Sequence, residues 1–381
     1  MNTFNRIKNH FSKVQPLPSG MYQKQAAEDG KPYRIHLRLQ ADGSGVLIVN
    51  AATILHLNPT AAEYAFHFIK GATPEEAARQ VSKRYRVNKK TALADFNNFA
   101  DQIQTLIRTP DLDPVSYLDF ERVAPHSESL SAPLRLDCAL TYQLPANSQA
   151  EYAPTKRVDR ELTTEEWQTI LDKAWQAGIP HITFTGGEPT LRGDLPALIA
   201  HAEKLGQVTG LLTDGLKLAG KEYLNTLLQT GLDHVMIVFQ PNNEQAWKAI
   251  ETVMPADLFV TVHLSVNNQI VKQGSETLKR LADLGVRNLS LSASDKSLIN
   301  ELLQLQNKAN ELRFSMRWDL PVPYSTAHPV AIETEDDKVP SGAGKVWMYV
   351  EPDGDVLPAQ GMAGNVLGNL LRDDWTKIYK P

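Results

Sequence analysis

Between residues 133 and 323 the chain alternates short apolar runs with amphipathic stretches, and this alternation constrains the fold more than any other feature. Predicted strands cover residues 136–142, 181–185, 209–213, 234–240, 259–266, 286–291 and 312–320, with predicted helices between them. Strands that alternate with helices form βα units around a parallel sheet. These six or seven consecutive βα units do not divide into two separate halves, which favours a partial (β/α) barrel over a doubly wound sheet. We therefore expect an α/β fold with its site at the C-terminal ends of the strands.

A smaller group of strands and helices precedes these units. Residues 33–57 are predicted to form strands, and three amphipathic helices are predicted after them. The first helix begins after Asn58, and Glu63 is placed for a capping box. We expect a small α+β domain over residues 26–108, preceded by a loose segment over residues 1–25.

Two further segments complete the predicted organisation. Residues 109–132 are rich in proline, serine and acidic residues, which is typical of a linker. Residues 326–381 follow the βα units and contain the hairpin turn Pro352-Asp353-Gly354. The βα domain is therefore expected to span residues 133–325 and to carry a β-hairpin extension at its C-terminal side.

The chain contains a single cysteine, Cys138, inside the predicted strand 136–142. One thiol can form neither an internal disulfide nor an all-cysteine metal site. Iron–sulfur clusters need several thiolates, or thiolates helped by histidine, because soft ligands must share the charge of the iron. We therefore interpret Cys138 as a small buried core residue and predict no iron–sulfur cluster.

Charge and hydropathy exclude several classes of partner. The formal net charge is −5, so no basic surface for nucleic acid or for an anionic membrane is expected. No apolar run approaches the roughly 20 residues that span a bilayer, and the first residues lack the apolar core of a signal peptide. Because 42% of the residues are apolar and 22% are charged, we expect an ordinary globular protein of the cytoplasm.

Three motifs in the βα region resemble those of the radical S-adenosylmethionine (SAM) superfamily. The first predicted strand ends Leu140-Thr141-Tyr142, the second runs into Gly186-Gly187-Glu188-Pro189, and the third ends Thr213-Asp214-Gly215. In that family the first strand leads into C-x3-C-x2-C-Y, whose cysteines hold an iron–sulfur cluster, and the later motifs read G-G-E-P and T-N-G. The resemblance implies a partial barrel of the radical SAM type.

The cysteines of this pattern are missing. The three cluster positions fall on Leu144, Ser148 and Glu151. The tail resembles the SPASM or "twitch" extension of peptide-modifying radical SAM enzymes, and there Ser341 and Ala359 stand at the cysteine positions. No side chain replaces a low-potential electron donor, because cofactors carry this chemistry. Radical initiation is therefore predicted to be lost.

Residues 53–87 resemble the PqqD-type peptide-recognition domain. The matching runs are T-I-L-H-L-N-P-T-A-A-E at residues 53–63, T-P-E-E-A-A at residues 73–78 and R-Y-R-V at residues 84–87. In that family an open winged-helix module binds the leader of a ribosomally made peptide, which adds a strand to its small sheet. The resemblance implies a winged-helix domain whose partner is a precursor-peptide leader or a modifying enzyme. A winged helix that only packs against its neighbour is the alternative.

A SAM-like site is the second candidate feature. Its residues are Gly186, Gly187, Glu188, Pro189, Thr213, Asp214 and Gly215. The two glycines permit close backbone approach, Glu188 could accept from an ammonium group, and Asp214 could reach a ribose hydroxyl. Against SAM binding, the strand that ends S-x-D-G in the family here runs into Gln240-Pro241-Asn242-Asn243. The alternative is that G-G-E-P survives only as the turn chemistry of the fold.

Other catalytic constellations are weaker. The candidate oxygen and imidazole ligands of the predicted barrel are Glu151, His181, His234 and His263. His181 and His234 head their strands, away from the predicted site, and only His263 could face inward. None of these histidines stands in an H-x-x-x-H or H-x-E spacing, and no G-x-S-x-G nucleophile motif is present, so no metal site is predicted.

Three hypotheses follow. The first is a non-catalytic, cluster-free relative of radical SAM enzymes that binds a peptide or partner during peptide maturation. The second is an enzyme that kept SAM binding and performs non-radical chemistry with Glu188 and a nearby base. The third is a genuine radical SAM peptide maturase, which the single cysteine opposes on ligand count.

Overall fold

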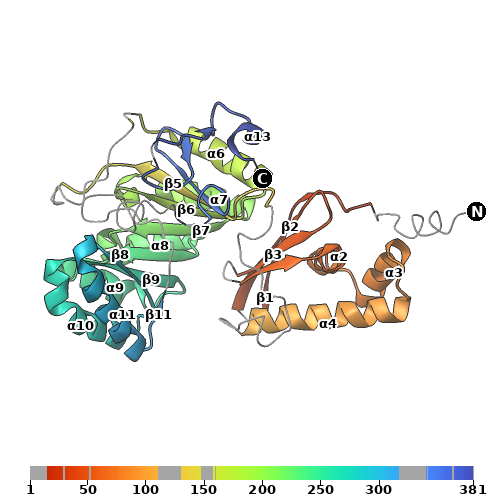
Figure 1. Cartoon of the computed structure of the whole chain (residues 1–381), viewed down its shortest axis with the longest axis horizontal. Helices are drawn as coiled ribbons and strands as arrows, with labels where there is room; N and C mark the ends of the chain where they lie inside the picture. The colour runs from red at the N-terminus through yellow and green to blue at the C-terminus, as the bar shows by residue number, and fades with distance from the viewer. Residues whose placement is uncertain are drawn as a thin grey trace, which may run out of the picture. The chain divides into compact units, whose positions relative to one another are not determined.

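The chain consists of two compact units, Met1–Ser131 and Ala132–Pro381, each with its own hydrophobic core (Figure 1). The computed structural model describes residues 15–28, 31–50, 53–109, 130–146, 158, 160–316, 340, 342–362 and 364–380. Most of the predicted linker, residues 110–129, lies outside this part of the chain. We call the two parts unit 1 and unit 2.

Unit 1 contains an antiparallel sheet of four strands in the order β1-β2-β3-β4. Its strands are β1 (Gly20–Glu28), β2 (Lys31–Leu39), β3 (Gly45–Val49) and β4 (Thr53–Leu57). Strand β1 was not expected, because residues 1–25 were predicted to be loose. Its sequence, GMYQKQAAE, has little β-branched character, but it pairs with β2 from Gly20↔Leu39 to Glu28↔Lys31. Cross-strand pairing therefore overrides the weak local propensity.

Three helices cover the core of unit 1: α2 (Pro59–Ile69), α3 (Pro74–Arg84) and α4 (Lys89–Arg108). Asn58 caps α2 as predicted, because its side chain accepts hydrogen bonds from the backbone N–H groups of Thr60 and Ala61. The predicted capping box at Glu63 is wrong. With Asn58 as the N-cap the N3 position is Ala61, so Glu63 lies too far along the helix to form the box, and its buried carboxylate pairs with Arg84 at 2.8 Å.

Unit 2 is organised on one sheet of ten strands in the order β11-β10-β9-β8-β7-β6-β5-β12-β13-β14. The parallel strands are β5 (Arg135–Thr141), β6 (His181–Gly186), β7 (Val208–Thr213), β8 (His234–Val238), β9 (Phe259–Val266), β10 (Asn288–Ala293) and β11 (Ser315–Met316). The sheet is mostly parallel and does not close, since β11 and β14 lie at its two ends. The α/β fold is confirmed as an open sheet. Residues 317–320 of the last predicted strand lie outside the described residues.

Helices alternate with these strands as predicted: α6 (Thr164–Ala177), α7 (Leu195–Leu205), α8 (Lys221–Gln229), α9 (Glu244–Val253), α10 (Asn268–Asp283) and α11 (Ile299–Glu311). Helix α10 begins six residues before the predicted start at Gly274. Its N-cap is Asn267, whose side chain accepts from the N–H groups of Gln269 and Ile270. This earlier start places polar residues of α10 at the C-terminal end of β9. Within the described residues, no helix is long and apolar enough to cross a membrane.

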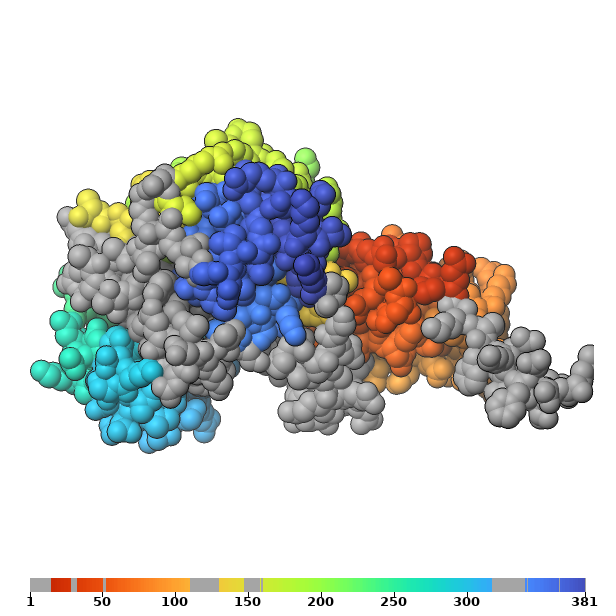
Figure 2. All heavy atoms as spheres, turned by 45° about the horizontal axis from the view of Figure 1, so that its top comes forward, coloured from red at the N-terminus to blue at the C-terminus, as the bar shows by residue number. Residues whose placement is uncertain are grey.

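The predicted C-terminal hairpin is present but is not a separate layer. Its strands β12 (Trp347–Val350) and β13 (Asp355–Leu357) flank the predicted turn, and β12 pairs in parallel with β5. The short strand β14 (Gly368–Asn369) and helix α13 (Trp375–Ile378) follow. Figures 1 and 2 show this segment (blue) beside α6, where Lys173 Nζ donates to the Leu370 carbonyl at 2.7 Å. The C-terminal residues therefore extend the main sheet.

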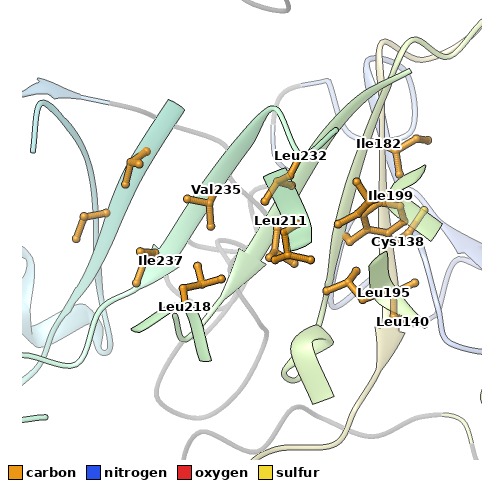
Figure 3. Close-up of a cluster of buried hydrophobic side chains, with 14 of the residues drawn as sticks. Cys138, Leu140, Ile182, Leu195, Ile199, Leu211, Leu218, Leu232, Val235 and Ile237 are labelled. Atoms are coloured by element: carbon orange, nitrogen blue, oxygen red, sulfur yellow. The ribbon is translucent and has the colours of Figure 1, made fainter. Parts of the chain in front are cut away.

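Cys138 belongs to the hydrophobic core between this sheet and its helices. Figure 3 shows it with Leu140 of β5, Ile182 of β6, and Leu195 and Ile199 of α7. The side chain has no exposed surface. Burial raises the pKa of its thiol well above the ordinary value, which disfavours the thiolate that a metal would require. The interpretation of Cys138 as a core residue therefore fits its surroundings.

Candidate functional site

A pocket of about 630 Å³ lies at the C-terminal ends of β5 to β9. The predicted segments that reach it are residues 144–146, Gly187 with Glu188, Asp214, and residues 240–243. Sequence reasoning therefore placed four loops correctly at one end of the sheet. It missed the fifth, after β9, where Ser265, Asn267, Gln269 and Ile270 also line the pocket. The polar run Asn267-Asn268-Gln269 after an apolar strand was the available signal.

Gly186 and Gly187 have a structural reason to be glycine. Gly186 has φ +127°, and a Cβ there would lie 2.2 Å from the Thr141 carbonyl oxygen. A Cβ on Gly187 would lie 2.3 Å from the Gln143 carbonyl oxygen. The Gly187 N–H donates to Thr141 O at 2.7 Å and the Glu188 N–H donates to Gln143 O at 2.8 Å. The glycine pair thus joins the end of β6 to the segment that follows β5.

Glu188 is buried in the wall of the pocket, and its carboxylate is already well supplied with donors. It accepts from the Thr190 N–H (2.9 Å) and hydroxyl (2.5 Å), from the Thr213 hydroxyl (2.8 Å), and from the Asp214 N–H (2.7 Å). These four donors tie the turn after β6 to the turn after β7. The expected role of Glu188 as the acceptor for a ligand ammonium is therefore not supported by this geometry, because its hydrogen-bonding capacity is used within the fold.

Asp214 has a different environment from Glu188. Its carboxylate lines the pocket, is half-buried, and accepts one hydrogen bond from the Leu216 N–H at 2.9 Å. Burial and the neighbouring Asp214 charge raise the pKa of Glu188 to about 8. Burial also raises the pKa of Asp214. Two adjacent carboxyl groups with raised pKa values favour a shared proton or a nearby cation.

The other predicted residues of the G-G-E-P and T-D-G turns act as supports. Pro189 begins the 3-10 helix η2 (Pro189–Leu191), and the Gly215 N–H donates to the Thr213 hydroxyl at 3.0 Å. Lys217 Nζ donates to the Thr190 carbonyl at 2.7 Å. These contacts hold the two turns together on the pocket wall.

The described residues that stand at the cysteine positions of the family are not metal ligands. Leu144 lines the pocket and Ala359 is buried, with 5% of its surface exposed. Ser148, Glu151 and Ser341 lie outside the described residues. Among the residues that the structure describes, no group of three or more His, Cys, Asp or Glu side chains could hold a metal ion. The described residues therefore do not fit an iron–sulfur cluster.

The histidines divide between the two ends of the sheet. His181 and His234, at the first residues of β6 and β8, share a hydrogen bond of 2.6 Å between their Nε2 atoms. Burial, with a smaller contribution from the Arg135 charge, lowers the pKa of His234 to about 4. His263 lies on β9 among hydroxyl groups, with Nδ1 3.0 Å from Ser290 Oγ and Nε2 3.1 Å from Ser292 Oγ. The histidines that head their strands are thus kept from the pocket.

Known proteins resemble this chain in sequence or in fold. Residues 138–258 match the model of the Radical SAM superfamily. The PqqA peptide cyclase of Streptomyces rochei is 28% identical over 281 residues, covering 66% of this chain and 76% of the relative. Streptococcus suis SuiB bound to its precursor peptide SuiA superposes with a TM-score of 0.60 at 15% identity, covering 91% of this chain and 87% of SuiB.

SuiB has also been solved bound to SAM, with a TM-score of 0.58 to this chain. Because unit 2 is about two thirds of the chain, the 91% coverage by the SuiA complex extends into unit 1. At 15% identity this likeness concerns the fold alone. Residues 138–258 of this chain therefore match the Radical SAM superfamily, and the chain has homology to PqqA peptide cyclases.

Proposed function

We propose that this protein is a cluster-free member of the radical SAM superfamily that binds a peptide, or a partner modifying enzyme, during peptide maturation. The observation that carries the proposal is the single thiol. The chain has one cysteine, and that residue is packed in the hydrophobic core at β5, on a sheet that keeps the G-G-E-P turn after β6. One buried thiol cannot supply the ligands of an iron–sulfur cluster.

Peptide binding is proposed for unit 1. Its PqqD-like motifs lie in β4, α2 and α3, and its sheet order leaves β1 and β4 each with one neighbour among the described strands. Such an edge supplies main-chain donors and acceptors to an added strand. Two similar proteins support a peptide as the partner. One is named PqqA peptide cyclase, and the other, SuiB, was solved bound to the precursor peptide SuiA. The hairpin beside β5 is proposed to be the remnant of a SPASM-type extension.

Metal analysis tests the cluster-free part of the proposal. The full chain is reconstituted anaerobically with iron and sulfide, and both elements are quantified. The triple variant Leu144→Cys, Ser148→Cys, Glu151→Cys is the matched control, because it restores a C-x3-C-x2-C spacing in the same fold. We expect no stoichiometric iron in the natural chain and bound iron in the variant. Roughly one cluster per natural chain would refute the proposal and favour a genuine maturase.

Hydrogen exchange tests the peptide part. The full chain is titrated with small peptides encoded beside its gene, and backbone amide exchange is followed by mass spectrometry. Strand addition predicts slower exchange in β1 or β4, because their outward N–H groups become hydrogen-bonded. Exchange that is unchanged at saturating peptide would contradict a recognition role for unit 1.

A second candidate function is an enzyme that kept SAM binding. The specific observation in its favour is that Asp214 and the G-G-E-P turn both reach the same pocket. Calorimetry with SAM tests it, and Asp214→Asn is the informative variant. Glu188→Ala is a poor test of SAM binding, because removal of this carboxylate also leaves four internal hydrogen-bond donors without their acceptor. Clear SAM binding that Asp214→Asn weakens would favour this alternative.

A further inference from the structure

Strands β9 and β10 carry a group of imidazole and hydroxyl side chains that the proposed function does not use. The aliphatic residues of both strands belong to the hydrophobic core beneath the helices, so the alternate residues point to the opposite face of the sheet. The parallel register pairs His263 with Ser290 and Ser265 with Ser292. The two strands therefore bring one histidine and three serines together. We call these four residues the His263 cluster.

His263 stands at the centre of the His263 cluster, with a hydroxyl group beside each ring nitrogen. Its Nδ1 atom is 3.0 Å from Ser290 Oγ, and its Nε2 atom is 3.1 Å from Ser292 Oγ and 3.3 Å from Ser265 Oγ. In the tautomer that donates from Nδ1 to Ser290, the Nε2 atom accepts from a serine hydroxyl. A base that accepts from a hydroxyl on one side and is oriented by a third group on the other is the arrangement that activates a serine nucleophile.

Ser265 connects the His263 cluster to the unit 2 pocket. It lines this pocket of about 630 Å³, while His263 and Ser290 are buried behind it. Buried polar side chains cost free energy unless they are hydrogen-bonded, and aliphatic residues would fill the same face at lower cost. A hydroxyl that faces a pocket and contacts a buried imidazole meets the geometric requirement for a nucleophile with its general base.

The lining around Ser265 indicates the class of substrate. Asn267 Oδ1 accepts two backbone N–H groups at the start of α10, so its amide offers an NH₂ group to a ligand, and such a donor stabilises the oxyanion of acyl transfer. An apolar wall is supplied by Val238, Phe239 and Leu264. The described lining residues include no lysine, arginine or histidine that would attract an anion. The pocket therefore favours an uncharged ester with a short aliphatic acyl group.

We propose that Ser265 is a nucleophile, activated by His263, that hydrolyses short-chain carboxylic esters in the unit 2 pocket. Ser265 Oγ attacks the ester carbonyl carbon while its proton passes to His263 Nε2. The bond from that carbon to the leaving oxygen then breaks, and the departing alcohol takes the proton from Nε2. Water attacks the acyl-serine in the same way, which releases the carboxylic acid and restores the hydroxyl. The reaction consumes only ester and water, so it goes beyond the proposed binding function and does not rest on it.

A fluorophosphonate probe tests the nucleophile directly, because it forms a covalent bond with activated serines. The full chain is incubated with diisopropyl fluorophosphate and analysed by intact-protein mass spectrometry and peptide mapping. We expect one adduct per chain, on Ser265. The Ser265→Ala variant should stay unmodified, and Ser275→Ala, at an exposed serine of α10 outside the pocket, should react like the natural chain. No adduct, or an adduct on a different residue, overturns the assignment.

Two matched esters test the substrate class. These are p-nitrophenyl butyrate and mono-p-nitrophenyl succinate, whose acyl groups have the same number of carbons and differ by one carboxylate. We expect kcat/KM to be at least about tenfold higher for the butyrate, and Ser265→Ala to lower it at least about 100-fold. Equal turnover of the two esters overturns the substrate class. Butyrate turnover no faster than that of Ser265→Ala overturns the activity itself.

The role of His263 is tested through Ser290, which orients the imidazole and does not line the pocket. Ser290→Ala should lower kcat about tenfold with KM unchanged, because the substrate site is intact and only the base is less well positioned. Ser290→Thr keeps a hydroxyl group and should restore most of the rate. Circular dichroism melting shows that each variant is folded. A folded Ser290→Ala variant with unchanged kcat would contradict the assignment of His263 as the base.

These outcomes are independent of the tests of the proposed function. Failure of the probe and of both esters leaves the iron analysis and the exchange protection of unit 1 unaffected. Conversely, a stoichiometric cluster in the natural chain would refute the cluster-free function and would not by itself remove the reactivity of Ser265.

Discussion

The residues that follow β6 and β7 at the pocket resemble the family motifs more closely than the residues that follow β5 and β8. At the ends of β6 and β7 the chain keeps residues that resemble the family motifs, and these residues hold the fold together: Gly186, Gly187, Glu188 and Thr213. After β5, Leu144 stands at a position that resembles a cysteine of the family, and after β8 the chain reads Gln240-Pro241-Asn242-Asn243 where the family strand ends S-x-D-G. Both groups reach the pocket, but Glu188 and Thr213 are also joined to each other by hydrogen bonds within the fold. The comparison shows that the motif residues after β6 and β7 have a structural role of their own.

The largest expected effect comes from Gly187→Ala. Its Cβ would lie 2.3 Å from a backbone oxygen that cannot move without breaking the Glu188–Gln143 hydrogen bond. We expect a loss of at least about 3 kcal/mol in the free energy of unfolding, measured by urea denaturation. Gly193→Ala is the control, since a Cβ there meets no atom within 4 Å. If both variants were equally stable, the glycine pair would have no structural role.

Glu188→Ala comes next. The substitution leaves four donors around an empty volume, so we expect a loss of about 2–4 kcal/mol in the free energy of unfolding. Asp214→Asn keeps both the backbone N–H that reaches Glu188 and the acceptor for Leu216, and should cost under about 1 kcal/mol. A Glu188→Ala protein as stable as Asp214→Asn would show that the carboxylate serves a ligand rather than the fold.

The raised pKa of Glu188 predicts that the free energy of unfolding depends on pH. Its pKa is about 8 in the folded chain and near 4.5 when unfolded, so the folded state binds the extra proton between these values. Its contribution to stability is present at low pH and is lost progressively as the pH rises from 4.5 to about 8, by up to about 1.4 kcal/mol per pH unit. Urea denaturation at pH 6 and pH 8.5, compared with Glu188→Gln as the non-titrating reference, measures it. A constant difference between the two proteins would contradict the raised pKa.

Cys138→Ala should have the smallest effect. It removes one sulfur atom from a packed core, for which we expect a loss of about 1 kcal/mol in the free energy of unfolding. Iron content after reconstitution should be the same as that of the natural chain. Iron that is present in the natural chain and absent from this variant would mean that the thiol is a ligand and that its burial is not permanent.

Sequence periodicity predicted the βα order and the strand-end loops because each depends on residues close together in the chain. It failed where a partner lies far away. Glu63 was expected to act at the start of its own helix and pairs instead with Arg84 of α3, and β1 has weak strand propensity and forms through its pairing with β2. The loop after β9 was missed because its place at the pocket depends on the order of strands in the sheet.

The sequence by itself determined that this chain has one thiol, a βα succession and a hairpin, since composition and local pattern need no coordinates. Only the tertiary structure decided that β12 extends the main sheet beside β5 and that the Glu188 carboxylate is occupied by four internal donors. The physical reason is that hydrogen-bond satisfaction is a property of neighbours in space, and parallel sheets bring together residues separated by whole βα units.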